Sequence, residues 1–179
     1  IDNQRPVTHA AALDGSKKGA AVSFGVNEGI VPINQLQTSV QERERRKANE
    51  RSGEILQRVG MGMWGGALPG HWDVTDAETY AIFAYLWSVI EREGKEWAKE
   101  CHVLIMSDCE AALAPIETTR RKGLGAKDQD RHAMLEGIDE AIQMLGSATM
   151  VWTPGHSGIT MNAYADAIAK AYLERDPVF

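Results

Sequence analysis

The order of strand-like and helix-like segments is the feature that most restricts how this chain can fold. Three segments of strand character come first, and later strand-like segments alternate with helical ones. Strands are expected at residues 8–13, 19–26, 55–65, 102–107 and 148–153. Helices are expected at residues 75–92, about 108–120, 128–145 and 161–174. Leading strands can pair as an antiparallel meander, and strands separated by helices favour parallel pairing. The predicted fold class is therefore α/β, with a mixed five-stranded sheet flanked by helices.

Capping signals mark two of these helices. Residues 75–78 (TDAE) and 107–110 (SDCE) both match the pattern of a capping box at a helix start. The helix at 75–92 is apolar on more than one side, which indicates burial between a sheet and other helices. The strand at 102–107 is apolar without alternation, as buried parallel strands are.

Length and charge restrict the class of protein. The 179 residues suit one domain with a sizeable core, and a net charge of −6 argues against a protein that coats nucleic acid through its own basic surface. Residues 27–54 lie between the second and third predicted strands, and their middle, residues 41–52, is dense in charge of both signs and could form a helix, a long hairpin or a disordered loop. The chain begins at Ile1 rather than at a Met, so a piece of a larger protein is expected.

Three sequence features bear on the cellular compartment of the protein. No apolar run is long enough for a membrane-spanning helix, and the N-terminal residues lack the pattern of a signal peptide. Cys101 and Cys109 form no disulfide framework or zinc-binding pattern. We therefore expect an intracellular protein, in the nucleus or cytoplasm, with no membrane partner.

Four acidic residues lie where this scheme brings strand ends and helix starts together. Asp14 ends the first predicted strand, Asp108 follows the fourth, Glu78 lies in the first turn of the buried helix, and Asp166 lies in the last helix. Sites in open α/β sheets gather beyond the carboxyl ends of the strands. If the first and fourth strands are neighbours, Asp14 and Asp108 converge.

Taken alone, each acid has an ordinary structural explanation. Asp14 could open an Asp-Gly turn, and Glu78 could be the acidic partner in its capping box. Asp108 could interact with the helix dipole, and Asp166 could pair with Lys170 four residues later. The hypothesis of a site rests on their joint arrangement.

Four carboxylates packed together repel each other unless cations neutralise them. Hard oxygen ligands suit Mg²⁺ or Mn²⁺. Two such ions about 4 Å apart can hold the attacking water and the leaving oxygen of a phosphodiester. This chemistry needs no nucleophilic side chain, and the sequence has no Ser-His-Asp or Cys-His signature.

Four segments, in order, resemble the type 1 ribonuclease H family. Residues 13–16 (LDGS) are similar to the DGS that ends the family's first strand, and residues 76–78 (DAE) to the AE that opens its central helix. Residues 106–113 (MSDCEAAL) are similar to its TDSxxAL segment. Residues 151–170 (VWTPGHSGITMNAYADAIAK) closely resemble the ribonuclease H domains of non-LTR retrotransposon polyproteins. The resemblance covers nearly the whole chain and implies a ribonuclease H-like fold.

The resemblance implies an endoribonuclease that hydrolyses the RNA strand of RNA–DNA hybrids with two Mg²⁺ ions, for which Mn²⁺ could substitute. Asp14 would bridge both ions, and Asp166 would complete the site of the ion that activates water. Glu78 and Asp108 would complete the other site. His156, which alone could be a plain residue of a glycine-rich loop, would assist proton transfer or product release.

Substrate and partners also follow from the resemblance. It implies contacts to 2′-hydroxyls and backbone rather than to bases. The expected substrate contacts are Gly15, Ser16, Lys17, Lys18 and Asn162. For the two lysines, a solvated surface charge is the alternative. A reverse transcriptase domain in the same polyprotein is an expected partner besides the hybrid.

The sequence departs from the family pattern in three respects. Ala163 stands where a Glu is usual, and no basic helical protrusion is evident after Asp108. The separation between Asp14 and Glu78 is unusually long, so we expect a single domain over residues 1–179 with an insertion at about 27–54.

Two other functions remain open at this point. Resolvases, transposases and related nucleases share the sheet and the carboxylates but act on DNA. A catalytically silent nucleic-acid-binding module derived from a retroelement is the second. An unrelated doubly wound domain is disfavoured because no glycine-rich phosphate-binding fingerprint follows any predicted strand.

Overall fold

The computed structural model describes residues 7–28, 62–108, 129–152 and 160–173. The strands within these ranges are β1 (His9–Lys18), β2 (Ala21–Glu28), β3 (Met63–Leu68), β4 (His102–Ser107) and β5 (Ser147–Trp152). The helices are α3 (Val74–Glu93), the 3₁₀ turn η1 (Ala98–Glu100), α5 (Gln129–Met144) and α6 (Thr160–Ala171). Among these residues, no helix is long and apolar enough to span a membrane.

The five strands form one mixed sheet in the order β3-β2-β1-β4-β5. β1 pairs with β2, and β2 with β3, in antiparallel fashion, whereas β4 runs parallel to both β1 and β5. The predicted fold class is therefore confirmed, including the change from antiparallel to parallel pairing. A tight turn at residues 19–20 joins the antiparallel strands β1 and β2, whereas the parallel neighbours β4 and β5 are joined by a longer connection that contains α5.

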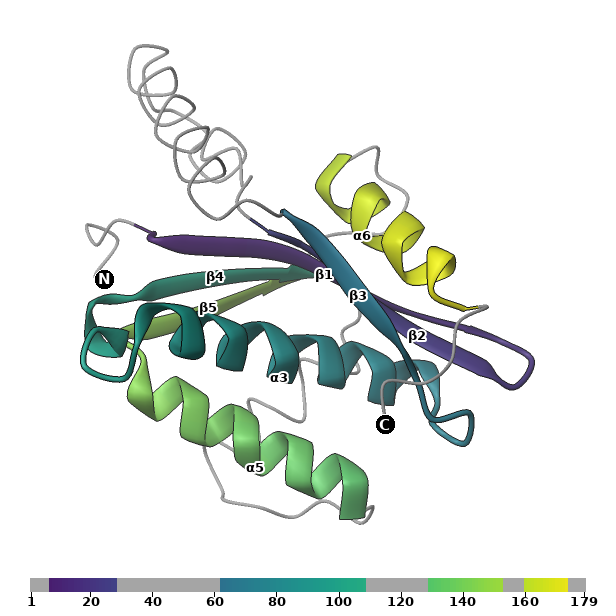
Figure 1. Cartoon of the computed structure of the whole chain (residues 1–179), viewed down its shortest axis with the longest axis horizontal. Helices are drawn as coiled ribbons and strands as arrows, with labels where there is room; N and C mark the ends of the chain where they lie inside the picture. The colour runs from purple at the N-terminus through teal and green to yellow at the C-terminus, as the bar shows by residue number, and fades with distance from the viewer. Residues whose placement is uncertain (1–6, 29–61, 109–128, 153–159, 174–179) are drawn as a thin grey trace.

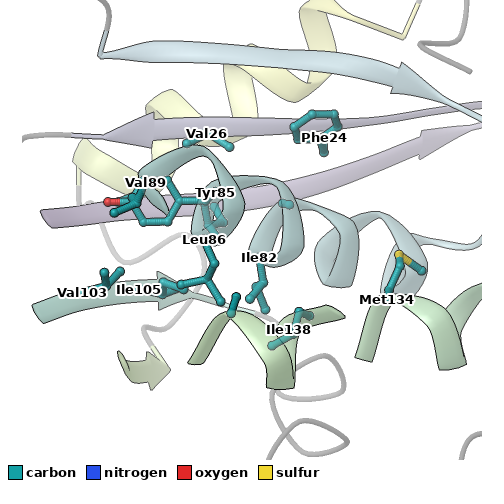
Figure 2. Packing of buried hydrophobic residues seen from close by; sticks show 14 of the residues in the cluster. Phe24, Val26, Ile82, Tyr85, Leu86, Val89, Val103, Ile105, Met134 and Ile138 are labelled. Carbon is teal, nitrogen blue, oxygen red and sulfur yellow. The ribbon is translucent and has the colours of Figure 1, made fainter. Parts of the chain in front are cut away.

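Helices cover both faces of the sheet (Figure 1). α3 and α5 lie on one face, and α6 lies on the other. The larger core fills the space between the sheet, α3 and α5, where Ile82 and Leu86 of α3 pack near Ile105 of β4 and Ile138 of α5 (Figure 2). A smaller cluster lies beneath α6 and consists mainly of small or flexible residues: Ala10, Ala12, Leu104, Met106 and Ala165.

The first strand is longer than the predicted 8–13. β1 continues through Asp14 to Lys18 because its antiparallel pairing with β2 extends to the register pair Lys18 and Ala21. The reversal occurs at Gly19, whose φ of +61° favours a residue without a Cβ. Asp14 therefore lies inside a paired strand and does not open a turn, which corrects the alternative explanation of this residue.

Apart from the start of β3, the other boundaries move less. β2 starts and ends two residues later than predicted, and β3 begins at Met63, whereas a strand was expected from residue 55. Residues 55–61 and the helix expected at 108–120 fall mainly or wholly outside the described residues. β4 has the predicted bounds, and α3, α5 and β5 differ from theirs by one residue at each end. α6 starts one residue earlier and ends three residues earlier than predicted.

The start of α3 differs from the prediction in a way that matters for the site. The N-cap is Asp73, not Thr75, and its side chain accepts from the backbone N–H of Asp76 at 2.7 Å. The Asp76 carboxylate in turn accepts from the backbone N–H of Asp73 at 2.9 Å. The capping box is thus formed by two aspartates, and Glu78 has no part in it.

Candidate metal centre

Asp14 lies in the middle of the sheet, on its central strand. Its neighbour Leu13 pairs with Ser107 at the end of β4, and Asp108 follows directly. Parallel β1 and β4 therefore bring the two aspartates to the same edge, as expected for acids near the carboxyl ends of neighbouring parallel strands. Asp14 is buried, with 8% of its surface exposed, whereas Asp108 is partly exposed.

Glu78 reaches the site from α3. Its close approach depends on Gly15, because a Cβ at this position would lie 2.8 Å from the Cβ of Ala77 and 2.9 Å from the backbone nitrogen of Glu78. Contacts that short are repulsive, so only glycine lets the first turns of α3 rest on β1. The same residue donates its backbone N–H to Oδ1 of Asp14 at 2.9 Å. Gly15 thus has a clear structural role, while a contact of Gly15 with substrate stays a prediction.

Asp14, Glu78 and Asp108 form one cluster. Each can offer a carboxylate oxygen, and these oxygens lie within 4.8 Å of one another. Glu78 is 3% exposed, and its Oε2 atom is buried without a hydrogen bond from the described residues, although the side chain does interact with Asp14. Three carboxylate oxygens so close together are the kind of ligand set that hard divalent cations take.

The cluster changes the pKa of Asp14. Burial is the main cause that raises the pKa of its carboxyl from 3.8 to about 7, and the negative charges of Asp108 and Asp166 raise it further. A hydrogen bond with Glu78 acts in the opposite direction. Like charges held together in a desolvated site raise the pKa in this way. Without a cation, Asp14 therefore takes up a proton as the pH falls through about 7.

Asp166 approaches Asp14 from the opposite face of the sheet and is not one of the three residues whose oxygens lie within 4.8 Å of one another. It lies on α6 and is close enough to Asp14 for a hydrogen bond between the two side chains. It also forms an ion pair with Lys170, one turn along α6, with Nζ and Oδ2 2.8 Å apart. Hydrogen bonding to Asp166, followed by the charge of Asp166, raises the pKa of this exposed lysine. The ion pair expected as the ordinary explanation is therefore present together with the contact to Asp14.

The cluster is consistent with a bound Mg²⁺ or Mn²⁺ on chemical grounds. All its donors are oxygens, which these cations prefer to nitrogen or sulfur. Burial is the main cause of the raised pKa of Asp14, and the charge repulsion that adds to it would be relieved by a cation among the four carboxyl groups.

The other predicted site residues have varied outcomes. Lys17 donates from Nζ to the backbone oxygen of Trp72 at 2.8 Å, while Lys18 is exposed and Ser16 is partly exposed. Asn162 lies in α6, but its side chain is not among those described, and His156 lies outside the described residues. Contacts of these residues with substrate stay predictions.

Sequence reasoning missed the residues that position the acids. Arg131 of α5 binds both Asp73 and Asp76 at the start of α3, with Nη2 of Arg131 2.7 Å from Oδ1 of Asp76. The pattern D-x-x-D at residues 73–76 could have indicated the true cap, since Asp is among the preferred N-cap residues. No local pattern indicates the partner in α5, which is distant in sequence.

No model of a protein family matches the chain, and no curated protein matches it in sequence. Solved structures are similar in fold. RNase H1 of Halobacterium salinarum NRC-1 has a TM-score of 0.53 and 15% identity, with 92% of this chain and 96% of that chain covered.

Two further structures are equally similar. The N-terminal RNase H domain of a Mycobacterium tuberculosis protein, solved as a fusion with maltose-binding protein, has a TM-score of 0.57 and 12% identity, covering 93% and 96% of the two chains. An RNase H1 isolated from compost, solved in complex with an RNA/DNA hybrid, has a TM-score of 0.55 and 13% identity, covering 92% and 99%. The chain therefore has a ribonuclease H-like fold.

Proposed function

Starting from this fold, we propose that the chain is a metal-dependent endoribonuclease that hydrolyses the RNA strand of RNA–DNA hybrids. The observation that carries the proposal is the cluster of Asp14, Glu78 and Asp108, whose oxygens lie within 4.8 Å of one another beside the end of β4. Asp166 approaches the same group from the other face. The hybrid bound to the compost RNase H1 supports this choice of substrate.

The four carboxylates would hold two Mg²⁺ ions, for which Mn²⁺ could substitute. Asp14 would be shared by both ions, Asp166 would belong to one, and Glu78 and Asp108 to the other. When bound, such ions activate water and neutralise the charge that develops on the phosphodiester. Two-ion binding and these individual assignments are part of the proposal.

The chain's own residues control protons and position at the site. Asp14 would bind a cation in its ionised form, so protons and cations compete for it as the pH falls through about 7. Gly15 fixes the approach of Glu78 to Asp14. His156 would assist proton transfer or product release.

Choice of the RNA strand would come from contacts with its 2′-hydroxyls and backbone. RNA is distinguished from DNA by this hydroxyl, and a hybrid presents it in a wide, shallow minor groove. Ser16, Lys18 and Asn162 are the proposed contacts besides Gly15 and Lys17. The retrotransposon origin and a reverse transcriptase partner rest on the resemblance of residues 151–170 and stay hypotheses.

Cleavage of labelled nucleic acids tests the proposal. The substrates are an RNA–DNA hybrid, duplex DNA, a branched DNA, duplex RNA and single-stranded RNA, at low salt with Mg²⁺ or Mn²⁺. We expect cutting of the hybrid's RNA strand alone, and a loss of at least about a hundredfold in Asp108→Asn, because one ligand of the cluster becomes neutral.

Asp139→Asn is the matched control. This residue lies on α5 and accepts a hydrogen bond from Gln143 at 2.8 Å, so the same substitution is made away from the cluster. It should keep wild-type activity. Cutting of duplex or branched DNA would indicate a DNA nuclease instead, and hybrid binding without any cutting would indicate a silent binding module.

A further inference from the structure

The position of Asp166 depends on how closely α6 lies against the sheet. α6 packs on β1 and β2, and it carries Asp166 to Asp14 from the face opposite to α3. The residue of β2 that pairs with Asp14 is Gly25. The helix therefore crosses the sheet beside the acid that Asp166 contacts, and the separation of helix and sheet at Gly25 sets the separation of the two carboxyl groups.

Gly25 leaves no room between the strand and the helix. A Cβ at this position would lie 2.7 Å from the backbone nitrogen of Ala169 and 3.0 Å from the Cβ of Ile168, and closer still to the backbone oxygen of Ala165. Two of these three atoms belong to the helix backbone, which cannot rotate away as a side chain can. Any side chain larger than glycine's must therefore displace α6.

Other residues of α6, β2 and β3 show the same close approach of the helix to the sheet. Ala165 and Ala169, which face the sheet, are fully buried. The buried side chain of Ser23, also on β2, donates a hydrogen bond from Oγ to the backbone oxygen of Ala169. Gly65 of β3 pairs with Gly25, and a Cβ there would meet Ile168 of the helix at 3.2 Å.

We propose that Gly25 is a positioning residue of the metal centre, which sets the distance between Asp166 and Asp14 by letting α6 rest directly on β2. Gly25 itself touches neither a cation nor a substrate. The inference rests on the proposed function, since it takes the four carboxylates to be cation ligands. It adds that the distance from Asp166 on α6 to Asp14 depends on Gly25 having no Cβ.

Direct binding of Mn²⁺, measured by electron paramagnetic resonance on the whole chain without nucleic acid, tests this inference. We expect Gly25→Ala to weaken Mn²⁺ binding about tenfold or more, as changes that displace a metal ligand do. At Mn²⁺ concentrations high enough to saturate Gly25→Ala, its rate of hybrid cleavage should recover toward that of the wild type. Circular dichroism and thermal denaturation report whether the variant is folded.

Gly146→Ala is the matched control. A Cβ there would lie 2.8 Å from Cε1 of His102 and 2.9 Å from the backbone oxygen of Cys101, so the same methyl group is forced into a similarly tight place. Gly146 precedes β5 at the opposite end of β4 from Asp108. We expect it to lower the melting temperature while Mn²⁺ binding changes by less than about twofold. Equal weakening in both variants, or none in Gly25→Ala, would overturn the inference.

Ser23→Ala covers the case in which Gly25→Ala does not fold. It removes the hydrogen bond to Ala169 without adding volume, so it loosens the same helix. Weaker Mn²⁺ binding in a folded Ser23→Ala supports the inference, and unchanged binding overturns it. If the wild-type chain binds no Mn²⁺, the proposed metal centre itself fails. If the wild type binds Mn²⁺ and cuts the hybrid while folded variants bind equally well, only the role of Gly25 fails.

Discussion

The fold changes the ionisation of Asp14. Its pKa rises from 3.8 to about 7 because it is buried beside other carboxylates. An acid of this kind is protonated in the folded chain and ionised in the unfolded chain at pH values between the two pKa values. Its contribution to stability is therefore fully present below about pH 4 and is lost as the pH rises through 7.

This gives a prediction for the metal-free protein. The free energy of unfolding, measured by urea denaturation in a chelator, should fall by a few kcal/mol between pH 4.5 and 7.5, since a shift of this size corresponds to roughly 4 kcal/mol at most. Asp14→Asn should remove most of that fall and be more stable than the wild type at pH 7.5. Asp139→Asn should keep it. A wild-type pH dependence in Asp14→Asn would assign the proton to another group.

At the scale of secondary-structure elements, α3 and α5 are joined at their starts. Arg131 of α5 donates from Nε to Oδ1 of Asp76 at 2.8 Å and from Nη2 to both carboxylate oxygens of Asp73 at 3.1 Å. Asp76 is 7% exposed, so Arg131 is the charged partner of a largely buried side chain, whereas Asp73 is exposed. The contact fixes the first turn of α3, two residues before Glu78.

Removing this contact should weaken the whole fold. We expect Arg131→Met to lower the free energy of unfolding by about 1–3 kcal/mol, because it leaves the buried Asp76 without a charged partner. A double-mutant cycle with Asp76→Asn, followed by urea denaturation, should give a coupling energy of about 1 kcal/mol or more. Lys95→Met, at an exposed position, is the control for loss of a cation. A cost for Arg131→Met no larger than this control would contradict the prediction.

Elements determined by local pattern could be predicted, and those determined by distant partners could not. β4 has its predicted bounds because a continuous apolar run, with a polar residue after it, is a local signal. β1 extends beyond its apolar run because β2 pairs with residues that carry no strand signal of their own. The cap of α3 had two local candidates, and the aspartate pair is the one that also binds Arg131.

The same distinction applies to the site. The four acids were predicted because the segments that contain them resemble, in the same order, those of the type 1 ribonuclease H family. The sequence does not show how closely β1, α3 and α6 can approach one another. Gly15 and Gly25 each matter through a Cβ that is absent, and the atoms that it would meet belong to helices far along the chain. Only the packed structure shows that these two glycines place Glu78 and Asp166 on either side of Asp14.

At the scale of the whole molecule, the carboxylates lie where three layers meet. Asp14 belongs to the sheet, Glu78 to the helix layer on one face and Asp166 to the helix on the other. Two cations that share Asp14 would link the layers, and a ligand that binds only the folded state stabilises that state by mass action. At a hundred times the dissociation constant the gain is about 2.7 kcal/mol.

Mg²⁺ should therefore raise the melting temperature of the entire chain. For a protein of this size the gain corresponds to roughly 5–10 °C in differential scanning calorimetry. The rise should be larger at pH 8 than at pH 6, because at the lower pH a proton on Asp14 competes with the cation. Asp108→Asn should lose most of the rise, and Asp139→Asn should retain it. If Mg²⁺ raises the melting temperature of Asp108→Asn as much as that of the wild type, the stabilising ions bind elsewhere, and the cluster at the end of β4 does not join the layers through a metal.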